Sequence, residues 1–168
     1  MGKDKDGDWD PDVYAKWLGI NICSCGTNNF YTIRIRWIEV PMMSESDFGN
    51  IQAVRCVANI FTFGFTERSI AEVVGESKKH THECVEIDFT CNKCKRTFKR
   101  TYEIVSEEVG NTARWGYYRK EYKCIRMCTT RRSFDFIEGK YRSMWANYSI
   151  LDGRHCKKWS KDFYSKIN

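Results

Sequence analysis

The sequence lacks the features of a disordered, secreted or membrane-spanning chain. Only two of its 168 residues are proline, and no low-complexity linker interrupts it. No apolar run approaches the roughly 20 residues that a helix needs to cross a bilayer. The acidic, polar start "MGKDKDGDWDPD" has none of the organisation of a signal peptide. We therefore expect an intracellular protein, cytoplasmic or nuclear, without a transmembrane segment.

The chain is long enough for one hydrophobic core and too short for two. Hydrophobic residues make up 42% of the sequence and aromatic residues 15%, which is typical of a globular protein rather than a disordered one. We expect residues 1–12 to form an acidic, flexible N-terminus and residues 13–168 to form a single domain.

Histidine is scarce, with three residues, whereas cysteine is abundant, with nine. Nine thiols without a secretion signal indicate a reducing compartment, where cysteines bind metal, pack in the core or react instead of forming disulfides. The few histidines limit the choice of base for any thiol that acts as a nucleophile.

The charge of the chain is unevenly distributed. Residues 114–168 hold 14 Lys and Arg against 5 Asp and Glu, whereas residues 1–113 hold 14 against 17. A basic half of this kind can bind nucleic acid, anionic lipid or an acidic protein, and it is equally compatible with an ordinary solvated surface. The candidate binding cations, which are interleaved with aromatic residues, are Arg96, Lys99, Arg100, Arg114, Arg131 and Arg132.

Alternating apolar and polar residues predict antiparallel strands before the last third of the chain. The stretch "FYTIRIRWIEV" (30–40) has the pattern of a half-buried strand. The stretches "ECVEIDFTC" (83–91) and "RTFKRTYEIV" (96–105) predict two antiparallel strands joined by a cysteine-bearing turn. The pattern of "RWGYYRKEYKC" (114–124) does not decide between strand and helix.

Helical spacing occurs near the end of the chain. Apolar residues from Ile137 to Tyr148 recur at intervals of three or four, which predicts an amphipathic helix. The same spacing from Trp159 to Ile167 predicts a second helix, which begins near Cys156. The order of these elements predicts an α+β domain, with an antiparallel sheet followed by two C-terminal helices.

Two cysteines in the turn between the paired strands have the spacing of zinc ligands. Cys91 and Cys94, in "CNKCKRTF", look like a zinc-ribbon knuckle, in which one tight turn holds a metal ion with two thiolates. We expect a structural zinc ion here. A reduced protein also buries cysteines simply as small apolar side chains, and that alternative stays open.

A tetrahedral zinc site needs a second pair of ligands. If the strands after the knuckle run out and back, Cys124 and Cys128 return beside it, and we take them as the expected pair. Cys23 and Cys25, in "CSCG", are the rival pair, since this stretch is also a turn before a strand.

Cys156 lies where a helix favours a reactive thiolate. The positive end of the helix dipole lowers the pKa of a nearby thiol, and basic residues flank Cys156 on both sides. A thiol nucleophile also needs a base, usually histidine. His155 is the immediate neighbour, and adjacent residues point apart on a helix, which leaves His82 or His80. Cys156 also shares the apolar stripe of its helix, so a packing role is the alternative.

The stretches "HTHECVEIDF" and "YSILDGRHCKKWSKDF" together resemble the circularly permuted papain-like fold. Lecithin–retinol acyltransferase-like proteins and permuted deubiquitinase-like peptidases belong to that group, in which the histidine precedes the cysteine. The resemblance covers roughly residues 80–167. It implies that Cys156 is the nucleophile and His82 the general base, with His80 the second choice.

The chain departs from that pattern in two respects. Those families often have Asn before the cysteine, where this chain has His155. The third, polar residue of such a site is not identified by the sequence, and Glu103, in "TYEI", is named only as a guess.

Two functions are therefore expected as alternatives. The first is a cysteine hydrolase or acyltransferase that acts on an amide, ester or thioester of an unidentified protein or lipid substrate. The second is a zinc-stabilised basic module that binds nucleic acid or an acidic protein without catalysis.

Overall fold

The computed structural model describes residues 15–18, 23–41, 81–106, 109–119, 121, 123–149 and 153–168. The N-terminus predicted to be flexible lies outside the described residues, and so does His80. The described part of the chain is an α+β structure, as predicted from the order of the sequence patterns.

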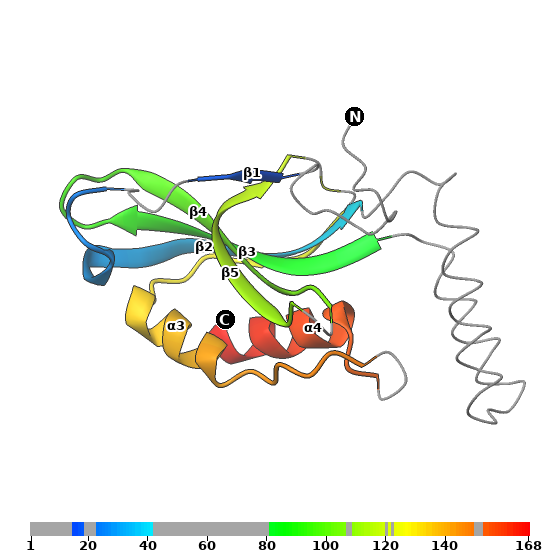
Figure 1. Ribbon diagram of the computed structural model, residues 1–168. Helices are drawn as coiled ribbons and strands as arrows, with labels where there is room; N and C mark the ends of the chain where they lie inside the picture. The colour runs from blue at the N-terminus through cyan, green and yellow to red at the C-terminus, as the bar shows by residue number, and fades with distance from the viewer. Residues whose placement is uncertain are drawn as a thin grey trace, which may run out of the picture.

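The sheet has six antiparallel strands in the order β1-β5-β4-β3-β2-β6. Their bounds are β1 Ala15–Trp17, β2 Phe30–Pro41, β3 Thr81–Cys91, β4 Thr97–Ile104, β5 Asn111–Tyr118 and β6 Lys123–Cys128. Figure 1 shows both helices on one face of this sheet. The strands predicted at 30–40, 83–91 and 96–105 are confirmed, and the undecided stretch after them provides β5 and β6.

Alternation along β2 separates a core face from a charged face. Ile35 and Trp37 are buried in the main hydrophobic cluster with residues of the helices. Arg34 and Arg36 point to the other face, where they pair with carboxylates of β3. A bulge just after Thr32 shifts the register, and Ile33, which the simple alternation would bury, is 36% exposed.

Helix α3 (Phe134–Arg142) begins after Ser133, whose side-chain oxygen accepts a hydrogen bond from the backbone N–H of Phe136 at 3.2 Å. It is shorter than its apolar spacing predicted, because the chain leaves the helix at Ser143. Met144, which continues the predicted pattern, is still buried in the core.

Helix α4 (Cys156–Ile167) packs mainly against β3 and β4. Its residues Trp159, Phe163 and Ile167 are fully buried, which confirms the predicted apolar stripe. Within the described part of the chain, no helix has both the length and the apolar character that a membrane span requires.

Candidate functional site

The cysteine at the start of α4 is the first residue of the helix. Just before the helix, Ser149 and Arg154 exchange two backbone hydrogen bonds of 2.7 Å, and Gly153 has a φ of +66°. The N-cap residue, His155, has an extended backbone and makes no side-chain cap. The positive end of the helix dipole therefore lies at the thiol of Cys156.

A hydrogen bond one turn further along fixes α4 against the start of β3. The hydroxyl of Ser160 donates to the backbone carbonyl of Glu83 at 2.8 Å, and both groups are buried. The backbone of the same Glu83 lies close enough to the thiol of Cys156 to lower its pKa. The thiol is thereby held next to His82, which precedes Glu83 on the strand.

His82 connects this thiol to a buried carboxylate. Its side chain is 1% exposed, and its interaction with the thiol of Cys156 raises the pKa of the imidazole. Its Nε2 lies 2.8 Å from Oε2 of Glu103 on β4. Because an ionised carboxylate only accepts hydrogen bonds, Nε2 donates to Glu103, which leaves Nδ1 as the ring nitrogen for the thiol.

Glu103 is completely buried and accepts hydrogen bonds from several sides. Besides the imidazole, its donors are the hydroxyl of Tyr118 at 2.8 Å, the guanidinium of Arg114 at 2.9 Å and the hydroxyl of Thr112 at 3.3 Å. All three come from β5, the strand beside β4. These donors fix the carboxylate, and through it the orientation of the His82 ring.

The electrostatics favour a charged pair at this site. Burial raises the pKa of Cys156, but its hydrogen bonds to His155 and His82 and the positive charge of His82 outweigh burial and lower the pKa to about 5. Burial lowers the pKa of His82, whereas its bonds to Cys156 and Glu103 raise it to about 10. At neutral pH these directions favour a thiolate beside an imidazolium.

Glu103 supplies the balancing negative charge. Burial alone raises its pKa, but hydrogen bonds and charge from His82 and Arg114 lower it to about 2. A cysteine, a histidine and an orienting carboxylate in this order form the constellation of a nucleophile, a base and a positioning group.

His155 differs from the sequence-based expectation. We expected it to point away from the neighbouring thiol, yet its side chain is close enough to lower the pKa of Cys156. The helical argument does not apply to it, because His155 has an extended backbone and lies just outside α4. The thiol therefore has two imidazoles, one buried and one half-buried.

A second group of side chains forms a candidate metal centre. The sulfur atoms of Cys23, Cys25, Cys91 and Cys94 all lie within 4.8 Å of one another. Two tight turns present them, one before β2 and one between β3 and β4. The turns meet because Phe30 is paired with Cys91 at the shared end of β2 and β3.

Local hydrogen bonds shape both turns. Lys95 donates its backbone N–H to the carbonyl of Cys91 at 3.0 Å and takes a φ of +61°, which closes the knuckle tightly. The side chain of Asn29 donates to the carbonyl of Cys25, and the backbone N–H of Asn92 donates to Asn29 at 2.8 Å. The two turns are thus bonded to each other as well as to their own strands.

The donor set matches a closed tetrahedral site. Four thiols, with no carboxylate or imidazole among them, are a common ligand set for structural Zn²⁺, with Zn–S bonds of about 2.3 Å. Hydrogen bonds from the backbone N–H groups of Cys94 and Lys93 lower the pKa of Cys91 to about 7 despite burial. Burial and the neighbouring thiols raise the pKa of Cys25 to about 11.

The expected second pair, Cys124 and Cys128, is not in this group, and the rival pair takes its place. The reason is the strand order: after β5 the chain crosses to the far edge of the sheet, where β6 pairs with β2. Cys128 lies opposite Ile35, five residues along β2 from Phe30. At roughly 3.3 Å per residue, that separation is on the order of 16 Å.

Of the six predicted binding cations, three lie beside carboxylates of the protein and three are exposed. Arg100 and Arg114 are used inside the protein: Nε of Arg100 lies 3.2 Å from Glu138, and Arg114 pairs with Glu103. Lys99 is half-buried and pairs with Glu86 at 2.8 Å. The exposed members of the predicted set are Arg96, Arg131 and Arg132.

Several residues of the active-site candidate were missed by the sequence patterns. Tyr118, Arg114 and Ser160 have no local signal for their roles. Glu103 was named only as a guess, and a charged residue within a buried strand is the signal that could have identified it. Comparison with known proteins adds no family: no family model, curated protein or solved structure matches the chain.

Proposed function

We propose that the protein is a thiol-dependent hydrolase or acyltransferase in which Cys156 attacks the carbonyl carbon of an amide, ester or thioester. The observation that supports this proposal is the arrangement of three side chains: the imidazole of His82 lies 2.8 Å from the carboxylate of Glu103, and it lowers the pKa of the Cys156 thiol at a helix start. The substrate is a protein or lipid-derived acyl compound, which is the substrate class implied by the papain-like resemblance.

The reaction begins with a bond between the sulfur of Cys156 and the carbonyl carbon. The carbonyl oxygen becomes an oxyanion, which the backbone N–H groups at the start of α4 stabilise. The imidazolium of His82 then gives its proton to the leaving amine, alcohol or thiol, and the bond to that group breaks. The products of this half are a thioester on Cys156 and a neutral imidazole.

The second half restores the starting state. Neutral His82 takes a proton from water or from an acceptor amine, alcohol or thiol, whose heteroatom attacks the thioester. The tetrahedral intermediate collapses, the acyl group leaves with the attacking heteroatom, and the proton on His82 balances the thiolate of Cys156. Water gives hydrolysis and another acceptor gives acyl transfer. Glu103 keeps the imidazole oriented throughout and stays ionised.

The metal in the four-cysteine centre is, in this proposal, a structural zinc ion. The centre is far from the thiol, because His82 and Cys91 lie at opposite ends of β3, roughly 30 Å apart along an extended strand. The ion would fix the two turns and take no part in acyl transfer. Zinc thiolates and a free nucleophilic thiol both require reduced cysteines, which supports the expected intracellular location.

The decisive experiment compares two thiols of the same protein. Cys124 is more exposed than Cys156, and burial raises its pKa despite the nearby Arg36. If labelling follows thiolate content, iodoacetamide at pH 6 modifies Cys156 at least about tenfold faster than Cys124. If labelling follows exposure alone, Cys124 reacts first. Mass spectrometry of peptides gives both rates from one sample.

A variant of His82 distinguishes the effect of the histidine on the thiol pKa from the effect of the helix dipole. His82→Gln is expected to remove much of the preference for Cys156, since only His155 and the modest effect of the helix dipole would then lower the pKa of the thiol. Equal labelling of Cys124 and Cys156 in the wild-type protein would contradict the enzyme proposal. The remaining candidate would then be a zinc-stabilised binding module without catalysis.

A further inference from the structure

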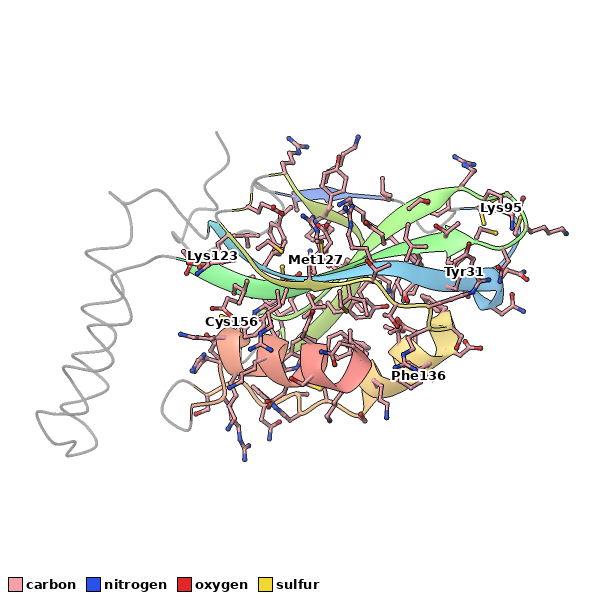
Figure 2. All side chains as sticks on the ribbon, turned by 180° about the vertical axis from the view of Figure 1, so that it is seen from behind. Tyr31, Lys95, Lys123, Met127, Phe136 and Cys156 are labelled. Carbon is pink, nitrogen blue, oxygen red and sulfur yellow. The ribbon has the colours of Figure 1, made fainter. Side chains whose placement is uncertain are left out.

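Cations and aromatic rings that are exposed or half-buried gather at the metal end of the molecule. We propose that this surface, here called the cationic strip, binds single-stranded nucleic acid. Figure 2 shows Lys95 and Tyr31 at this end and Cys156 toward the other end of the molecule. The strip consists of Lys93, Lys95, Arg96, Arg131, Arg132 and Lys140, with the rings of Tyr31 and Phe136.

Hydrogen bonds make the strip continuous. The guanidinium of Arg131 donates to the side chain of Asn92 at 3.2 Å, which connects the β6–α3 segment to the cysteine knuckle. The backbone N–H of Thr32 donates to the carbonyl of Arg132 at 2.8 Å. Tyr31 is paired with Ser133, the N-cap residue of α3. The strip therefore runs from the knuckle, across the start of β2, to α3.

The rings and cations of the strip are stacked on one another. The guanidinium carbon of Arg131 lies 3.8 Å from the ring centre of Tyr31. The exposed ring of Phe136 has Arg132 at 5.2 Å and Lys140 at 5.3 Å. Flat guanidinium groups and aromatic faces are the surfaces on which unpaired bases stack, while the cations hold the phosphates.

The cations of the strip keep their charge available for a ligand. Arg34, Arg36 and Lys99, on the charged face of the sheet, all form salt bridges with carboxylates of β3. Within the described residues, by contrast, no carboxylate lies within salt-bridge distance of any cation of the strip. Asp135 is its nearest acidic residue in the sequence, beside Phe136 in the first turn of α3. The strip thus presents six cations and little opposing charge.

The aromatic rings of the strip favour a ligand with unpaired bases over the other ligands that a basic surface can bind. An acidic protein would use only the cations, and Phe136, an apolar ring that is 36% exposed, would have no evident partner. A regular duplex presents phosphates but keeps its bases stacked on each other, so the rings would again remain unused. A single strand can satisfy both groups.

One end of the strip lies at the metal centre. Lys93 and Lys95 lie in the loop closed by Cys91 and Cys94, and Arg96 follows it directly. A metal ion on these sulfurs would hold the three cations in one arrangement beside Arg131. Removal of zinc with a chelator is therefore expected to weaken nucleic-acid binding by at least about threefold.

The test measures binding of fluorescent 12-nucleotide single strands, oligo-U and oligo-dT, by anisotropy at several salt concentrations. The double variant Arg131→Ala/Arg132→Ala is expected to weaken binding at least tenfold and to reduce the salt slope by about 1.4, for two lost phosphate contacts. Phe136→Ala is expected to weaken binding by about tenfold through lost stacking. Far-UV circular dichroism checks that each variant is folded.

Matched controls separate the strip from general charge. Lys158→Ala/Lys161→Ala removes two exposed cations from α4 and is expected to change binding less than twofold. Arg131→Lys/Arg132→Lys keeps the charge but loses the flat groups, and an intermediate loss of binding is expected. Cys156→Ser is expected to bind normally, so the strip is tested independently of the proposed enzyme.

Three results would overturn the proposal. One is binding that does not change with salt. Another is a loss of affinity in the α4 control, Lys158→Ala/Lys161→Ala, as large as that in Arg131→Ala/Arg132→Ala. The third is a poly-glutamate peptide or a duplex that competes as well as the single strand, which would assign the strip to an acidic protein or to double-stranded nucleic acid.

Discussion

The imidazole of His82 and the carboxylate of Glu103 meet at 2.8 Å in the interior of the protein, and neither side chain is more than 1% exposed. Two ionisable groups buried in this way are stable only when each has its partner. Their charges make the active-site candidate sensitive to pH in both directions.

Acid is expected to destabilise the protein through Glu103. Its pKa is lowered from 4.5 to about 2, so its contribution is present above pH 4.5 and is lost as the pH falls toward 2. The contribution is on the order of 3 kcal/mol at neutral pH. Glu103→Gln is expected to be less stable at pH 7 and to lose stability less steeply below pH 4.5, as measured by urea unfolding. Parallel curves would contradict the assignment.

A rise in pH is expected to destabilise the protein through His82. The pKa of His82 is raised from 6.5 to about 10, so its contribution to stability is complete below pH 6.5 and is lost as the pH rises toward 10.

His155 is expected to help lower the pKa of Cys156. His155→Ala is expected to move the midpoint of the alkylation rate of Cys156 to higher pH without changing the labelling of Cys124. An unchanged midpoint would show that His155 does not lower the pKa of Cys156.

Ser160 is expected to position the nucleophile. Ser160→Ala removes its hydrogen bond to Glu83, which is expected to destabilise the protein by about 1 kcal/mol and to slow alkylation of Cys156. Ser165→Ala is the matched control, because this exposed hydroxyl bonds only the carbonyl of Lys161 within the same helix. Equal effects of the two substitutions on alkylation would contradict the positioning role.

The metal centre is expected to depend on the rival cysteine pair. Purified protein is expected to hold about one equivalent of zinc, and Cys25→Ser to lower this below about half an equivalent, as measured by elemental analysis. Cys128→Ser is expected to retain the metal, because Cys128 lies outside the sulfur group. Loss of metal in both variants, or in neither, would contradict the assignment of ligands.

Two glycines test the packing of the sheet and the helix. Gly116 has a φ of +136°, and a Cβ there would lie 2.2 Å from the backbone oxygen of Lys16 in β1. Gly116→Ala is expected to destabilise the protein by about 2–3 kcal/mol. Gly139, in α3, has open space around it, and Gly139→Ala is expected to stabilise by about 0.5–1 kcal/mol. Thermal unfolding measures both, and similar shifts would contradict the packing argument.

Much of the active-site candidate could be predicted, because its parts have local signals. Cys156 is indicated by its place at a helix start. Setting His155 aside leaves His80 or His82 as the base, and the resemblance favours His82. Glu103 could only be guessed, because its place depends on strand pairing. Val85 is paired with Tyr102, and one further step in that register puts Glu103 opposite Cys84, on the face that carries His82.

The sequence by itself determined the local elements: the strand at 30–40, the hairpin that carries the knuckle and the amphipathic helix after Cys156. Periodicity records which face of a single element is buried, and that information is local. Only the tertiary structure decided that β6 crosses to β2, that Cys23 and Cys25 meet the knuckle, and that β5 surrounds Glu103 with donors. Those choices depend on contacts between residues far apart in the chain, whose packing and hydrogen bonds no local pattern encodes.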